Sequence, residues 1–132
     1  MRDGDRTVSG SIESDAAPEL VVDLLVDASR IPEWAPAFAD TVARDDEAWR
    51  ASMGQSEFTF SVVAVSAAGT VDFIRELAPG QLGGAYLRVV PRPRGGCVIT
   101  MTLPVRPGTD PAATRATLTA ELIALEALAS GE

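Results

Sequence analysis

From Asp40 onward, hydrophobic and polar residues alternate with a period of two, which is the pattern of half-buried β-strands. The segment Thr7–Ser14 alternates in the same way, although Gly10 weakens the pattern. The strands predicted after Asp40 are Thr41–Arg44, Ala48–Met53, Glu57–Ser66, Thr70–Leu77, Gly84–Val90 and Cys97–Leu103. The connections between them are too short for parallel crossovers. The pattern therefore predicts an antiparallel sheet of six or seven strands.

Three segments have helical periodicity instead. Pro18–Asp27 begins with a residue that suits the first helical position, and its apolar residues share one broad face. A single turn is expected over Ile31–Trp34, because the prolines of the sequence IPEWAP prevent a longer helix. A long helix is predicted over Pro111–Ala129, with Asp110 as its N-cap and a stripe of leucines that faces the sheet.

Alternation within each strand also predicts which side chains face the helices, because successive side chains of a strand point to opposite faces. The residues expected on the inner face are Trp49, Ala51, Met53, Phe58, Phe60, Val62, Val71, Phe73, Ala85, Leu87, Val89, Cys97, Ile99, Met101 and Leu103. The same rule places Arg75 on the inner face and Tyr86 on the outer face. The predicted interior is apolar, with one arginine on its wall.

The order of these elements resembles the SRPBCC superfamily, also called the START or Bet v 1-like helix-grip fold, and its polyketide cyclase/dehydrase-type members. The resemblance rests on the segments APELVVDLLVDASRIPEWAPAF and GGAYLRVVPRPRGGCVITMTL and on the leucine-striped terminal helix. It implies one α+β domain over residues 1–132, in which a curved antiparallel sheet wraps around the long C-terminal helix. It also implies an apolar cavity between the sheet and that helix.

The composition excludes many kinds of catalytic site. The chain has no His, no Lys and a single cysteine, Cys97. A Ser–His–Asp or Cys–His triad, a histidine metal site, a zinc cluster, a Schiff base and a P-loop lysine are therefore impossible for this chain alone. We expect no metal and no cofactor. The remaining chemistry is that of carboxylates, tyrosine, arginine and hydroxyl groups.

Charge and hydropathy limit the kinds of partner that the protein is expected to bind. The formal net charge of −8 repels phosphate backbones, so a nucleic-acid partner is not expected. No apolar stretch approaches the roughly 18 residues of a membrane span. Residues 1–6 lack the apolar core of a signal peptide, so we expect a disordered N-terminal segment and a cytoplasmic protein. The expected state is a monomer or a homodimer.

The candidate ligand contacts are the large side chains of the predicted cavity wall. They are Trp34, Phe38, Trp49, Met53, Phe58, Phe60, Phe73, Leu87, Ile99, Met101, Leu118 and Leu122. Trp34 and Trp49 are large enough to stack on a ligand ring. The alternative is that these aromatic residues only fill the core, as large aromatic side chains do in most proteins.

Three residues are candidates for catalytic roles. Arg75 could anchor a ligand carboxylate or enolate, or it could reach the surface and pair with an acid. Glu121 borders the leucine stripe, and a carboxyl group buried in an apolar cavity could act as an acid or base; the alternative is a solvated residue at the rim. Tyr86 could donate a hydrogen bond to a carbonyl group, but its position in the strand directs it away from the cavity.

Two hypotheses of function follow. The first is a protein that binds a hydrophobic or aromatic small molecule in its cavity, similar to polyketide cyclases and dehydrases; any catalysis would be of the lyase or isomerase type. The second is a module that binds another protein. It requires a filled core and an exposed apolar patch formed by Trp34, Phe38 and the segment Leu77–Leu82. The volume of the cavity distinguishes the two.

Overall fold

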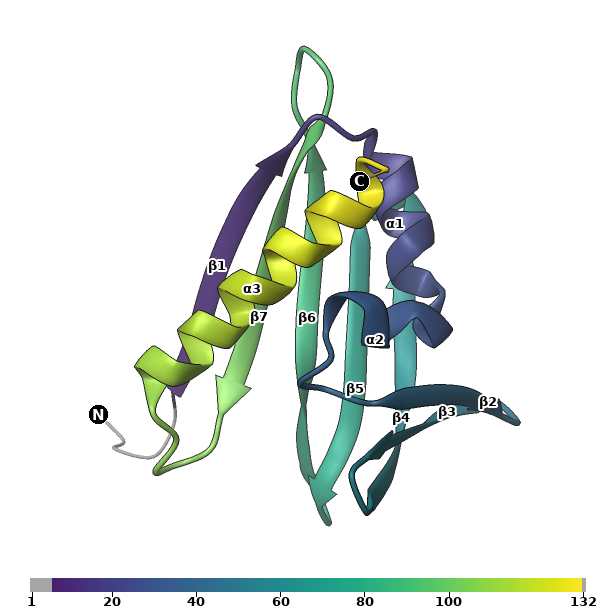
Figure 1. Cartoon of the computed structure of the whole chain (residues 1–132), viewed down its shortest axis with the longest axis vertical. Coiled ribbons are helices and arrows are strands. Elements are labelled where there is room, and N and C mark those ends of the chain that lie inside the picture. Colours follow the sequence, from purple (N-terminus) through teal and green to yellow (C-terminus); the bar gives the residue numbers. More distant parts are fainter. Residues whose placement is uncertain (1–5, 132) are drawn as a thin grey trace.

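The computed structural model describes residues 6–131 and has a curved seven-stranded sheet with all of its helices on one face (Figure 1). The elements in chain order are β1 (Arg6–Ser14), α1 (Pro18–Val26), η1 (Ala28–Arg30), α2 (Ile31–Trp34), β2 (Thr41–Asp45), β3 (Ala48–Met53), β4 (Ser56–Val65), η2 (Ser66–Ala68), β5 (Thr70–Ala78), β6 (Gln81–Pro91), β7 (Cys97–Val105) and α3 (Pro111–Ala129). This arrangement confirms the predicted α+β helix-grip fold. The predicted disorder of residues 1–5 lies outside the described residues, whereas Arg6 begins β1.

The strands form one antiparallel sheet in the order β1-β7-β6-β5-β4-β3-β2. The first strand of the chain therefore lies beside the last one, with Arg6 opposite Val105 and Ser14 opposite Cys97. Figure 1 shows β2 and β3 running across the lower right of the view, at a steep angle to β5 and β6. The sheet thus curls beneath α2, and its inner face becomes concave.

The hairpin between β5 and β6 is longer than the sequence predicts. The predicted strands end at Leu77 and begin again at Gly84, yet β6 begins at Gln81, opposite Ala78. Gly84 has a φ of 148°, and a Cβ atom at this position would lie 1.8 Å from the carbonyl oxygen of Phe73. Gly84 is therefore required by a close approach of two backbones inside a continuous strand, and does not mark a break.

Helix α3 crosses the concave face and provides the opposite wall of the core (Figure 1). The carboxylate of Asp110 accepts a hydrogen bond from the Ala112 amide at 3.0 Å, which confirms the predicted N-cap. Leu118, Leu122 and Leu125 are buried, so the leucine stripe faces the sheet as predicted. They pack with the inner residues of the long strands, which are Val8, Val71, Phe73, Leu87, Val89, Cys97, Ile99 and Met101.

Helix α1 covers the upper part of the sheet beside the C-terminal end of α3 (Figure 1). It buries Val21, Val22, Leu24 and Leu25, which share one face because they are spaced one, three and four residues apart. Asp27 follows the last residue of the helix. The chain then turns through η1 into α2, and this turn brings Trp34 to the middle of the core.

Candidate functional site

A pocket of about 330 Å³ lies between α2, the inner face of the sheet and the N-terminal half of α3. This volume is at the lower end of the range that small-molecule sites occupy. The lining residues are Ile31, Trp34, Ala35, Ala37, Phe38, Phe73, Arg75, Gly84, Ala85, Leu103, Thr114, Thr117 and Glu121. The wall is mostly apolar. Its polar residues are two threonines, the cation Arg75 and the acid Glu121.

Small residues contribute to the lining of the pocket. On β6, Ala85 lies on the inner face in register with Phe73 of β5, and the backbone of Gly84 lies beside it. On the opposite side, Ala35 and Ala37 follow the short helix α2. The three alanines carry only a methyl group and so leave space between α2, α3 and the sheet, whereas Gly84 is small because a Cβ atom there would clash with the Phe73 carbonyl oxygen.

Aromatic rings form one side of this pocket. The ring centroids of Trp34 and Phe73 are 6.0 Å apart, and both residues are almost fully buried. Phe38 makes edge-to-face contacts with Phe58 and Phe60, at centroid distances of 5.3 and 5.4 Å. Such geometries stabilise aromatic pairs beyond their burial. Trp34, Phe38 and Phe73 line the pocket, whereas Phe58 and Phe60 support Phe38.

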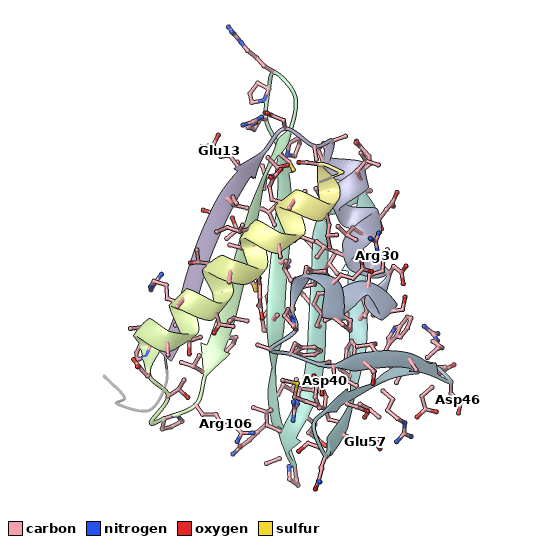
Figure 2. The ribbon with its side chains drawn as sticks, viewed as in Figure 1. Glu13, Arg30, Asp40, Asp46, Glu57 and Arg106 are labelled. Carbon is pink, nitrogen blue, oxygen red and sulfur yellow. The ribbon has the colours of Figure 1, made fainter. Side chains whose placement is uncertain are left out.

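Arg75 lies on the pocket wall of β5, where alternation places it two residues after Phe73. Its Cζ atom is 3.9 Å from the centroid of the Phe58 ring, so the guanidinium group contacts an aromatic face. Burial is the main cause that lowers the pKa of Arg75, and the like charge of Arg106 adds to it. Figure 2 shows Arg106 at the lower end of the molecule. Arg75 remains a cation at any physiological pH.

Glu121 enters the pocket from α3. Burial raises the pKa of its carboxyl group to about 7. No described side chain, within residues 7–131, donates a hydrogen bond to it, and none of the described ion pairs includes it. Thr114 and Thr117 share its face of the helix, since they precede it by seven and four residues. Near pH 7 this carboxyl group is therefore present in both its protonated and its ionised form.

Two N–H groups of the pocket residues are buried without an acceptor. They are Arg75 Nε and Trp34 Nε1. Every other buried side-chain nitrogen or oxygen atom of the described residues has a hydrogen-bond partner. Most buried polar groups in native proteins are hydrogen-bonded. Both exceptions therefore occur in residues of one pocket.

The structure separates the predicted ligand contacts into two groups. Trp34, Phe38 and Phe73 line the pocket, as do Arg75 and Glu121. The residues that lie outside its lining are Trp49, Met53, Phe58, Phe60, Leu87, Ile99, Met101, Leu118, Leu122 and Tyr86. Most of the second group fill the core around the pocket, whereas Met53, at the end of β3, is 38% exposed.

Trp49 and Tyr86 lie where their strands direct them. Trp49 is half-buried and its ring lies 5.2 Å from Cζ of Arg44. Tyr86 pairs in register with Asp72 and Thr102 on the outer face of the sheet. Neither residue reaches the pocket, which leaves Arg75 and Glu121 as its charged side chains.

Several lining residues are not among those predicted. Ile31, Ala35, Ala37, Gly84, Ala85, Leu103, Thr114 and Thr117 carry no strong sequence signal of ligand contact. The two threonines could have been found from their helical spacing to Glu121. The small residues could not, because an alanine that faces a pocket has the same strand or helix phase as an alanine in a packed core.

The residues proposed for the apolar patch of a protein-binding module do not share one exposed surface in this structure. Trp34 is 3% exposed and belongs to the core, whereas Leu82, at the β5–β6 hairpin, is 64% exposed. A protein-binding module also requires a filled core, whereas this structure has an unfilled pocket beside Trp34.

Two kinds of site are absent from the part of the chain that the structure describes. No three His, Cys, Asp or Glu side chains there gather closely enough to hold a metal ion. No helix within residues 6–131 has both the length and the hydropathy to cross a bilayer.

Solved structures with this fold include an enzyme. The Zhui aromatase/cyclase from Streptomyces sp. R1128 is 15% identical, with a TM-score of 0.67 over 96% of this chain and 94% of that one. A START superfamily protein from Mycobacterium smegmatis is 17% identical, with a TM-score of 0.67 over 95% and 97% of the two chains. The Aha1 dimer from Colwellia psychrerythraea is 12% identical, with a TM-score of 0.71 over 92% and 94%. These identities establish a shared fold.

The family itself is established by sequence. No curated protein matches the chain. The family model described as "Polyketide cyclase / dehydrase and lipid transport" matches residues 5–129, which is nearly the whole sequence. The match agrees with the helix-grip architecture and with the resemblance noted in the sequence. The chain is therefore a member of the polyketide cyclase/dehydrase and lipid transport family, within the SRPBCC superfamily.

Proposed function

We propose that this protein binds an apolar, ring-containing small molecule in the pocket between α2, α3 and the sheet. The observation that carries the proposal is a space of about 330 Å³ walled by Trp34, Phe38 and Phe73, in which the polar lining residues are Arg75, Thr114, Thr117 and Glu121. Ligand sites of this kind bury an apolar body and orient it with a small number of polar contacts. The similar aromatase/cyclase also supports a small-molecule function.

Binding can be tested with N-phenyl-1-naphthylamine, an uncharged dye whose fluorescence rises in apolar surroundings. We expect saturable binding to the native protein. Ala85→Phe adds a ring to the pocket wall and should weaken binding at least tenfold. The matched control is Ala116→Phe, the same substitution at an exposed position of α3 outside the pocket, which should bind the dye normally. Equal binding by both variants, or none by the native protein, would contradict the proposal.

A second candidate function is acid–base catalysis of the cyclase or dehydrase type. It is favoured by Glu121, because a carboxyl group with a pKa of about 7 can both accept and donate a proton at neutral pH. Cyclisation and dehydration of β-oxygenated carbonyl compounds require such transfers. Arg75, on the sheet side of the same pocket, could stabilise the enolate that forms when the proton leaves.

This second function can be tested by hydrogen exchange. The protein is incubated in D₂O with 1-phenylbutane-1,3-dione, and deuterium uptake at the carbon between the two carbonyl groups is followed by NMR. Catalysis by Glu121 predicts that the native protein accelerates exchange and that Glu121→Gln reduces the acceleration about a hundredfold. Equal rates for the two proteins would leave binding as the function of the pocket.

A further inference from the structure

The two buried N–H groups without an acceptor carry information about the ligand. Arg75 Nε and Trp34 Nε1 belong to different elements, β5 and α2, yet both residues line the same pocket. A buried donor without an acceptor destabilises a protein by about 1–3 kcal/mol, and by more when the donor is charged. Two such donors in residues of one pocket point to an acceptor that arrives with the ligand.

The surroundings of Arg75 favour an anionic acceptor. In residues 6–131, no acid forms an ion pair with Arg75, and the nearest charge that affects its pKa is the like charge of Arg106. By contrast, each of three other arginines of the sheet and its hairpins forms an ion pair with a neighbouring acid. These are Arg50, Arg88 and Arg92. Arg75 is thus a half-buried cation that forms no ion pair with a described acid, in a protein whose net charge is −8.

The chemistry of the two donors favours a carboxylate. A guanidinium group presents parallel N–H donors that match the two oxygens of a carboxylate. The indole N–H of Trp34 adds a single neutral donor, which suits the remaining lone pairs of the same group. The rings of Trp34, Phe38 and Phe73 provide an apolar wall for the rest of the molecule.

We infer that the ligand is an apolar monocarboxylate of one or two rings, with its carboxylate held by Arg75 and Trp34 and its rings placed against Phe38 and Phe73. This inference rests on the proposed binding function and names the chemical class of the ligand. A cationic ligand is disfavoured at pH 6, because Arg75 and Arg106 would repel it and Glu121, with its pKa raised to about 7, is mostly protonated. A fully apolar ligand would leave both buried donors without acceptors.

The test is competition against N-phenyl-1-naphthylamine at pH 6 by two compounds that share the naphthalene rings and differ in charge and by one methyl group. These are 2-naphthoate, which is ionised at this pH, and methyl 2-naphthoate, which is neutral. We expect the native protein to bind the carboxylate at least tenfold more tightly than the ester. Arg75→Met should abolish this preference while the affinity for the ester is retained. Trp34→Phe keeps an aromatic ring without the donor and should reduce the preference severalfold.

The matched control is Arg44→Met. Arg44 also lies beside an aromatic ring, that of Trp49, but it is exposed and lies outside the pocket, so the preference should persist. Circular dichroism establishes that each variant is folded. Equal affinities of the native protein for carboxylate and ester would overturn the inference and leave the proposed function intact. An unchanged preference in both Arg75→Met and Trp34→Phe would also overturn it. If neither the dye nor either naphthalene compound binds the native protein, the proposed function fails as well.

Discussion

Two glutamates of α3, five residues apart, have opposite environments. The carboxylate of Glu126 accepts hydrogen bonds from Ser14 Oγ at 2.6 Å and Ser130 Oγ at 2.5 Å, and these bonds lower its pKa. Glu121 has no such donors, and burial raises its pKa to about 7. Glu126 joins the end of the helix to β1, whereas Glu121 faces a pocket.

The comparison extends to the side chains around each glutamate. Leu125, the residue before Glu126, is fully buried, and the Glu126 carboxylate is hydrogen-bonded to Ser14. Around Glu121, small residues leave space, and N–H groups of Arg75 and Trp34 lack acceptors. The same helix and the same sheet therefore provide an end at which Glu126 is hydrogen-bonded into the structure, called the closed end, and an end at which Glu121 faces the pocket, called the open end. A groove of about 270 Å³ lined by Leu20, Leu24 and Leu128 also lies at the closed end, between α1 and α3. Side-chain size and hydrogen bonding decide the difference.

The largest effect is expected from a cavity at the closed end. Leu125→Ala removes a fully buried side chain from a filled region and should lower the free energy of unfolding by about 3 kcal/mol. Urea denaturation measures this loss. Phe38→Ala, at the half-buried pocket wall, should cost clearly less. Equal losses in the two variants would mean that the two ends are packed alike.

The next effect concerns the polar contacts of the closed end. Ser14 is buried; its hydroxyl donates to Glu126 and accepts from the Ala16 amide at 3.0 Å. Ser14→Ala leaves that amide and the carboxylate without these contacts and should destabilise the protein by about 2 kcal/mol. Ser11→Ala, at an exposed position of the same strand, is the control and should change the stability little. Equal melting temperatures for the two variants would contradict a structural role for the Ser14–Glu126 hydrogen bond.

A smaller effect is expected from the ionisation of Glu121. Because its pKa is about 7 in the folded protein and about 4.5 as an ordinary glutamate, the folded state binds the proton more tightly. Its stabilising contribution is complete below pH 4.5 and is lost as the pH rises through 7. Relative to Glu121→Gln, the native protein should lose about 1 kcal/mol between pH 5 and 8, since partial solvation reduces the cost of the charge. Parallel stability curves for the two proteins would contradict a raised pKa.

The smallest effect is a change in proton binding when a ligand enters. A bound carboxylate disfavours a second negative charge in the pocket and therefore raises the pKa of Glu121 further. Arg75 is the other charged side chain of the pocket lining and stays protonated. Calorimetric titration with 2-naphthoate at pH 7.5 in buffers of different ionisation enthalpy should show uptake of a fraction of a proton. Glu121→Gln should show none, and uptake by that variant would assign the proton to another group.

The sequence predicts the closed end of the molecule better than the open one. Strand alternation correctly places Ile99 and Met101 inside, and the helical stripe correctly buries Leu118 and Leu122, because burial in a packed core follows directly from side-chain periodicity. The same alternation places Arg75 on the inner face. These predictions need only the phase of each element.

The open end depends on how elements meet, which periodicity does not describe. Glu121 is at the edge of the leucine stripe, and its burial arises where α3 passes α2 and the pocket. Ala35 and Ala85 line the pocket although their positions along the chain are those of ordinary core residues. Met53 has the phase of an inner residue but lies at the end of β3, where it is partly exposed. The set of residues that line the pocket therefore depends on the curl of the sheet and on the position of α2. Neither can be predicted from the residue type at a single position of the sequence.

One measurement tests the contrast between the two ends most directly. Carbon-detected NMR can follow the carboxyl groups of Glu121 and Glu126 in one sample as the pH changes, with and without 2-naphthoate. The account predicts that Glu121 titrates near pH 7 and Glu126 below its ordinary 4.5, and that only the titration of Glu121 moves upward when the carboxylate is added. Two glutamates that both titrate near 4.5, with no response to 2-naphthoate, would contradict it.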